Sequence, residues 1–213
     1  MSLPKWPPEV DNQSQQALIH VATDWTLSHS LILRPNPPDL TSAVHGPFAL
    51  YPTPFPRVLF EKAVLLERAY NDLYMNLASD EAFLQRVIGQ VVAKVDSFQG
   101  GLWKIWEQVK EEGISQDLTL GIFRSDYLLH SPELTSNWDI RQVEFNTISS
   151  SFGPLANKVS DLHRYLTLSG AYASAHLRAE SIPKNNALVR LTAGLAQAHK
   201  AYGSPRYVPR EGL

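Results

Sequence analysis

The sequence contains no cysteine, no long hydrophobic run and no excess of charge of either sign. Without cysteine the chain forms no disulfide and no thiolate metal site. No stretch approaches the ~20 apolar residues of a membrane span, and residues 1–8 lack the apolar core of a secretory signal. A formal net charge of −2 gives no electrostatic reason to expect nucleic acid or an anionic membrane as a partner. A cytoplasmic protein is predicted.

Several common catalytic and nucleotide-binding motifs are also absent. Neither G-x-x-x-x-G-K-[ST] nor G-x-G-x-x-G occurs, so the chain carries neither common phosphate-binding loop. There is no G-x-S-x-G elbow, which argues against a serine nucleophile. The seven histidines are scattered and form no metal-binding pattern.

Apolar residues recur at helical spacing through most of the chain. Leu18, Val21, Ala22 and Trp25 follow the i, i+3, i+4, i+7 pattern of a first amphipathic helix. A proline-rich segment, 34–57, carries enough apolar residues to predict a packed irregular connection. Further helices are expected at about 59–77, 80–92, 97–112, 154–177 and 185–202. Ser79 or Asp80 is expected to cap the third helix and Asp96 the fourth, and Gly113 is expected to end the fourth.

Two segments are typical of strands. Residues 118–123 are predicted to form a buried strand and residues 140–146 another, separated by a loop over 130–138. The fold class is therefore α+β or α/β, in which a helical region, 1–117, leads into part of a mixed sheet. Residues 118–205 carry the strands and the site segments, and 206–213 form a tail of different character.

Polar residues at the end of the second strand suggest a cation site. Because side chains alternate along a strand, Glu144 and Asn146 point to one face, whereas Val143 and Phe145 point to the other and fill a core. A carboxylate and an amide oxygen suit Mg²⁺, which takes its remaining ligands from phosphate and water. The alternative is an ordinary solvated sheet face.

Anion-binding groups are expected near the same place. Ser149, Ser150 and Ser151 offer hydroxyl and main-chain N–H groups for a phosphate or carboxylate. Arg124 follows the first predicted strand, where open sheets place ligands, and a guanidinium there clamps a carboxylate. The alternatives are a plain serine-rich loop and a surface ion pair between Arg124 and Asp126.

Taken together these segments resemble a known family. The runs Arg124-Ser-Asp-Tyr127 and Val143-Glu-Phe-Asn-Thr-Ile-Ser-Ser-Ser-Phe-Gly153 are similar to the two signature segments of eukaryotic glutathione synthetases. Shorter agreements lie at 48–52, 112–114, 162–164 and 201–205. The similarity extends from about residue 15 to residue 205.

The resemblance implies an ATP-grasp ligase that joins γ-glutamylcysteine to glycine in glutathione biosynthesis. In such enzymes ATP phosphorylates the dipeptide, and glycine attacks the acyl phosphate. The residues matching Glu144 and Asn146 bind Mg²⁺, and that matching Glu144 also contacts ATP. Those matching Arg124 and Ile148 to Ser151 bind substrate. The resemblance also implies a homodimer.

The last residues depart from the family pattern. Pro209, Arg210 and Glu211 do not suit the hydrophobic strand expected there, and the rest of the ATP-grasp machinery is not in the sequence. We therefore expect a truncated chain that is inactive alone. The alternative is a non-catalytic remnant that serves only as a dimerisation or interaction module.

Overall fold

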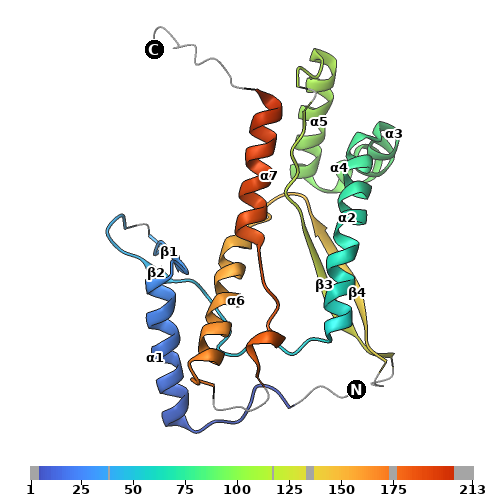
Figure 1. Cartoon of the computed structure of the whole chain (residues 1–213). Helices are drawn as coiled ribbons and strands as arrows, with labels where there is room; N and C mark the ends of the chain where they lie inside the picture. The colour runs from blue at the N-terminus through green and yellow to red at the C-terminus, as the bar shows by residue number, and fades with distance from the viewer. Residues whose placement is uncertain (1–4, 38, 117, 133–136, 173–176, 204–213) are drawn as a thin grey trace. The chain divides into compact units, whose positions relative to one another are not determined.

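The computed structural model describes residues 5–37, 39–116, 118–132, 137–172 and 177–203. The chain forms two compact units. The first unit comprises Met1–Pro56 and Ser150–Gln197, and the second comprises Arg57–Ser149 and Ala198–Leu213. The chain thus builds part of the first unit, forms most of the second, and returns to the first (Figure 1).

The first unit is built on two helices that pack side by side, α1 (Asn12–Ser28) and α6 (Gly153–Leu168) (Figure 1). Two short antiparallel strands, β1 (Ile32–Leu33) and β2 (Val44–His45), follow α1. A 3-10 turn, η3 (Ala179–Ser181), and helix α7 (Ala187–Tyr202) come after α6, and α7 belongs to the first unit as far as Gln197. The core consists of Leu18, Ala22, Trp25, Leu31, Leu162, Leu166 and Tyr172.

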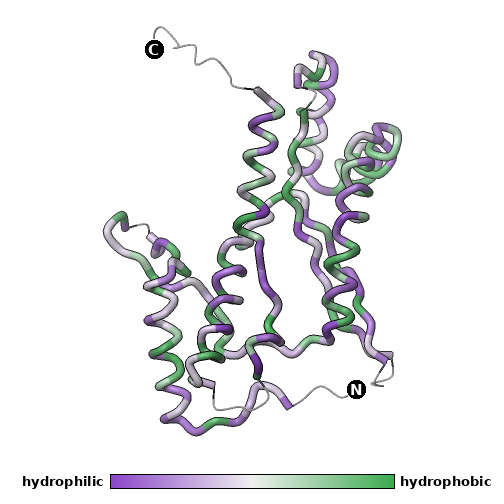
Figure 2. The backbone as a smooth tube through the Cα atoms, in the orientation of Figure 1, coloured by the Kyte–Doolittle hydropathy of each residue, from purple (hydrophilic) through white to green (hydrophobic). Residues whose placement is uncertain are grey.

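The sequence pattern explains how α1 forms. Its N-cap is Asp11, whose Oδ1 accepts a hydrogen bond from the main-chain N–H of Ser14 at 2.9 Å, and such a cap satisfies an otherwise unpaired amide. The predicted stripe is confirmed at Leu18, Ala22 and Trp25, which are buried, but not at Val21, which is 37% exposed. Figure 2 shows hydrophobic and hydrophilic residues alternating around the turns of this helix, as expected with one buried face.

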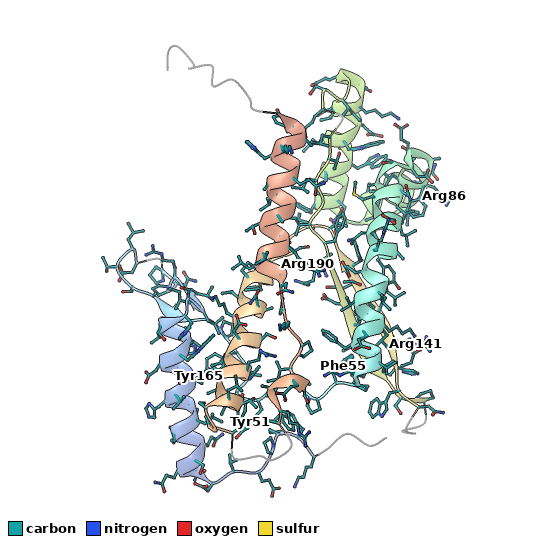
Figure 3. All side chains as sticks on the ribbon, viewed as in Figure 1. Tyr51, Phe55, Arg86, Arg141, Tyr165 and Arg190 are labelled. Atoms are coloured by element: carbon teal, nitrogen blue, oxygen red, sulfur yellow. The ribbon has the colours of Figure 1, made fainter. Side chains whose placement is uncertain are left out.

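The proline-rich connection is packed, as predicted. Phe48, Leu50 and Tyr51 lie against the core of the first unit. Tyr51, labelled in Figure 3, lies in this connection, and its ring stacks on Tyr172 with 5.1 Å between centroids. Strand β2, which lies within this connection, was not predicted, because a two-residue strand leaves no periodic signal.

A buried hydrogen-bond chain joins this connection to α6. The hydroxyl of Tyr172 donates to the carbonyl of Leu50 at 2.8 Å and lies 2.7 Å from Nδ1 of His163. Because the hydroxyl proton is used on Leu50, Nδ1 of His163 must be the donor in the second bond. Burial lowers the pKa of His163 to about 4, so the imidazole is neutral at pH 7.

The second unit starts with α2 (Arg57–Ser79), which packs against a hairpin of β3 (Arg124–His130) and β4 (Asp139–Asn146) (Figure 1). Between α2 and β3 the chain forms further helical segments, α3 (Glu81–Leu84), the π-helix η1 (Gln85–Val92), α4 (Ala93–Val95) and α5 (Ser97–Glu112). Asp80 and Asp96 cap α3 and α5, and Gly113 with φ of 90° ends α5, so those three predictions are confirmed.

The α+β prediction is confirmed, and two element predictions are wrong. Residues 118–123 form no strand; Leu118 and Leu120 are 37% and 50% exposed, and the ring of Phe123 lies against Gly121. The strand instead starts at Arg124, where cross-strand partners exist. Helix α6 ends at Leu168, not near residue 177, because Gly170 with φ of 73° turns the chain. Residues 173–176 and the predicted tail at 206–213 lie outside the described residues.

Both sheets in the described part of the chain are two-stranded and antiparallel. The expectation that Arg124 lies at the carboxyl end of a strand is wrong. Arg124 starts β3, and antiparallel pairing brings it opposite the end of β4. Within the described ranges, no helix has the length and apolar character needed to cross a membrane.

Candidate functional site

The β3–β4 hairpin places the predicted charged residues opposite one another. In its register Arg124 faces Asn146 and Asp126 faces Glu144. The ladder shifts by one residue between Asp126 and Tyr127, which leaves Val143 as a bulge. Val143 is consequently 59% exposed, so the prediction that it fills a core is wrong.

The other face of the hairpin carries Phe145 and packs against α2. The ring of Phe145 stacks on Tyr74 with 4.0 Å between centroids and also contacts Tyr70 and Phe123. This confirms the predicted inward direction of Phe145. Beyond the bulge, Lys62 of α2 binds Asp139 at 2.7 Å. The strand pair that carries the polar face is therefore held to α2 by aromatic packing on its other face and by an ion pair at one end.

Arg124 is held by carboxylates on that polar face. Its Nε donates to Oδ1 of Asp126 at 2.8 Å and its Nη2 donates to Oδ2 at 3.1 Å. The same Nη2 lies 3.6 Å from Oε1 of Glu144. The amide nitrogen of Asn146 donates to the main-chain carbonyl of Arg124 at 3.2 Å. Arg124, Asp126, Glu144 and Asn146 thus form one cluster.

Charge pairing sets the protonation states in this cluster. The hydrogen bonds from Arg124 hold the pKa of Asp126 below its ordinary value. Reciprocally, the hydrogen bond with Asp126 raises the pKa of Arg124. Asp126 is therefore ionised and Arg124 protonated at neutral pH. The cluster combines a cation with carboxylate oxygens at a half-exposed surface.

The remaining predicted site residues follow β4 in the segment 147–152. Ile148 and Ser149 belong to the second unit, and Ser150 and Ser151 belong to the first. Ser149 and Phe152 have φ of 57° and 66°, values that cost non-glycine residues energy and cluster at functional sites. Helix α6 starts immediately afterwards, with Pro154 in its first turn. Phe152, at its N-cap, supplies no side-chain hydrogen bond.

The residues present suit a hard cation. Glu144 and Asn146 offer a carboxylate and an amide oxygen on one face, the ligand types that Mg²⁺ prefers. Among the described residues no three His, Asp or Glu side chains gather as a metal site. That does not conflict with Mg²⁺, which usually binds one or two carboxylates and completes its shell with phosphate and water.

Comparison with known proteins decides the family. The family model described as "Eukaryotic glutathione synthase, ATP binding domain" matches residues 12–208. The chain belongs to this family. Its site segments, Arg124–Tyr127 and Val143–Gly153, lie inside the matched range.

Curated relatives in the family are longer than this chain. The sequence is 34% identical over 189 residues to the glutathione synthetase of Dictyostelium discoideum and 34% identical over 197 residues to that of Homo sapiens. These matches cover 86% and 92% of this chain, but 39% and 40% of the relatives. The large chain of the Schizosaccharomyces pombe enzyme is 33% identical, with 95% of this chain and 41% of the relative covered.

A solved structure supports the same assignment. A glutathione synthetase-like effector from Globodera pallida, in its apo form, superimposes with a TM-score of 0.73 at 29% identity. The match covers 94% of this chain and 42% of the effector. The fold of this chain is thus that of one part of a larger glutathione synthetase-like protein.

One member of the cluster was not recognised as a site residue. The sequence presented Asp126 only as the alternative partner of Arg124, and the structure shows that pair to be real. The signal was present: two residues apart on a strand means one shared face. It was missed because the strand was predicted to end at 123, which placed both residues in a loop.

Proposed function

We propose that this chain is the part of an ATP-dependent glutathione-forming ligase that holds Mg²⁺ and an anionic group of the substrate. The observation that supports this most strongly is the convergence of Arg124, Glu144 and Asn146 on one hairpin face within the family match. The chain spans about two-fifths of the curated relatives. The whole reaction is therefore proposed for the protein together with the remaining machinery of such relatives.

Glu144 and Asn146 would hold the cation through side-chain oxygens, and Glu144 would also contact ATP. A bound Mg²⁺ neutralises phosphate charge and aligns the transferred group, which is most of what phosphoryl transfer requires. Asn146 would bind through Oδ1, because its amide nitrogen donates to the carbonyl of Arg124 and a cation is bound by oxygen.

Arg124 and residues Ile148 to Ser151 would bind γ-glutamylcysteine. A guanidinium pairs with a carboxylate in two parallel hydrogen bonds and stabilises negative charge that develops beside it. The serines supply hydroxyl and main-chain donors in a segment whose positive φ at Ser149 and Phe152 marks a constrained turn.

The proposed reaction joins two substrates after activation by ATP. ATP transfers its terminal phosphoryl group to the carboxylate of γ-glutamylcysteine, and ADP leaves. The amine of glycine then attacks the acyl phosphate, and inorganic phosphate leaves as the amide forms. None of these steps needs a nucleophilic side chain from this chain, so the absence of a G-x-S-x-G motif from the sequence agrees with the proposal.

The experiment uses the purified 213-residue chain with Mn²⁺ as a paramagnetic probe. We expect Mn²⁺ to broaden the amide signals of β3 and β4, and Glu144→Gln to weaken that binding at least roughly tenfold. Glu111→Gln, on the exposed surface of α5, is the matched control and should change nothing. Unselective broadening, or equal broadening in the Glu144 variant, would contradict the proposed cation site.

Activity separates the proposal from its alternative. With ATP, Mg²⁺, γ-glutamylcysteine and glycine we expect no glutathione from residues 1–213 alone, since the chain spans only part of its relatives. The alternative, an interaction module, is favoured by exposed apolar side chains on α7, where Leu195 is 48% exposed. Self-association without any Mn²⁺ or substrate binding would support that alternative.

The cytoplasmic location and the homodimer remain part of the proposal. Equilibrium sedimentation of the chain, and of a longer protein containing it, would measure the subunit number directly.

A further inference from the structure

Asp126 lies beside both Arg124 and Glu144, the side chains to which the proposed function assigns the substrate and the cation. It lies two residues after Arg124 on the same strand face, and directly opposite Glu144 in the ladder. Both of its carboxylate oxygens accept from Arg124, at 2.8 and 3.1 Å. Glu144 is the weaker partner of the same guanidinium, at 3.6 Å.

The geometry of this pair restrains the guanidinium. An arginine has five N–H donors in a rigid plane, and Asp126 takes one from Nε and one from Nη2. Two parallel hydrogen bonds fix the plane of the group as well as its position. The two N–H groups of Nη1 do not take part in this pair and lie at the opposite edge of the guanidinium.

We propose that Asp126 is a positioning residue that keeps Arg124 from closing on Glu144. By holding the guanidinium side-on, it leaves the Glu144 carboxylate open to a cation and the Nη1 edge of Arg124 open to an anionic substrate group. This inference rests on the proposed function. The Arg124–Asp126 ion pair is then more than an ordinary surface contact, because it orients Arg124 within the site.

The physical argument is a competition for one carboxylate. Arg124 lies within reach of two acidic side chains, and a positive charge left with only one of them moves toward it. Without the charge of Asp126, Arg124 would form a close pair with Glu144 and occupy the oxygens that the cation needs. Asp126 thereby supports cation binding without being a ligand.

A double-mutant cycle tests this with Mn²⁺ as the probe. We expect Asp126→Asn to weaken Mn²⁺ binding about tenfold, the size typical of groups that orient a metal ligand. In an Arg124→Gln background the same change should shift Mn²⁺ binding by less than about twofold, the scatter of independent sites. Asp72→Asn, which removes an exposed carboxylate from α2 of the same unit, is the control.

A second measurement examines the pair without any ligand. The Nε–H signal of Arg124, assigned from its loss in Arg124→Gln, should be protected from exchange in the unchanged chain and unprotected in Asp126→Asn. An unprotected signal in the unchanged chain would overturn the inference.

The outcomes separate the two claims. If Asp126→Asn weakens Mn²⁺ binding equally in both backgrounds, Asp126 acts as a ligand or through its charge alone, and the positioning role is wrong while the proposed function stands. If the Arg124 signal is protected but the unchanged chain binds no Mn²⁺, the proposed function fails and the positioning role fails with it.

Discussion

The buried hydrogen-bond chain of His163, Tyr172 and Leu50 provides a sharp test of how the first unit is stabilised. Tyr172→Phe removes only the hydroxyl that accepts from His163 and donates to Leu50. Tyr172 and His163 are 6% and 5% exposed, so water does not readily replace the lost bond at the imidazole. The ring of Tyr172, which stacks on Tyr51, stays in place.

The expected cost follows from the group left without a partner. A buried donor that loses its acceptor costs about 1–3 kcal/mol, whereas Leu50 is only half-buried, so we expect its carbonyl to regain a partner from solvent. The free energy of unfolding of the first unit should therefore fall by about 2 kcal/mol. That corresponds to roughly 30-fold faster exchange of its most protected amides.

Native-state hydrogen exchange measures this unit separately. Peptides from α6 report on the first unit and peptides from α5 on the second, so the second serves as an internal control. Tyr165→Phe makes the same chemical change on α6 at a side chain that is 42% exposed, and it should leave exchange unchanged.

A double variant tests whether the cost comes from an unpaired group. In His163→Leu with Tyr172→Phe both partners are apolar, and such paired replacements are far less costly than either single change. We expect the double variant to lose less stability than the two single variants added together. Additive losses, or exchange in Tyr172→Phe within about twofold of the unchanged chain, would refute the reasoning.

Three further predictions concern pH, packing and capping. Because burial lowers the pKa of His163 from 6.5 to about 4, the unfolded chain binds a proton first. Stability should be constant above pH 6.5 and fall by about 3 kcal/mol between pH 6.5 and 4, and His163→Leu should flatten that slope in urea titrations. Gly89→Ala would place Cβ 2.9 Å from the buried ring of Trp103 and should cost about 1–3 kcal/mol. Gly101→Ala, with no atom within 4 Å of the new Cβ, should instead stabilise α5 by about 0.5–1 kcal/mol. Asp96→Ala removes the cap of α5 and should lower the melting temperature through a loss of about 1 kcal/mol, while Asp96→Ser keeps most of it.

The sequence predicted the helices well because their signals are local. The stripe in α1, the caps Asp80 and Asp96 and the stop at Gly113 each act within one or two turns of the chain. The same holds for the family, since the signature run through Glu144 and Asn146 is contiguous. Such features need no knowledge of distant contacts.

The strands were harder to predict for the opposite reason. Residues 118–123 have the composition of a strand, but a strand requires a partner, and the ladder starts only at Arg124. The bulge at Val143 likewise follows from how β3 and β4 pair, and nothing in the local sequence marks it. The π-helix η1 lies beside the ring of Trp103, a contact that joins residues 14 positions apart.

The sequence by itself determined the family, the helical elements and the identity of Arg124, Glu144 and Asn146 as candidates, because each depends on neighbouring residues or on a contiguous motif. The tertiary structure decided that Asp126 joins them. Antiparallel pairing places Asp126 opposite Glu144, and the fork to Arg124 forms only when that strand face exists. The Tyr172 hydrogen bonds to His163 and Leu50 were likewise decided by packing, since they join residues up to 122 positions apart.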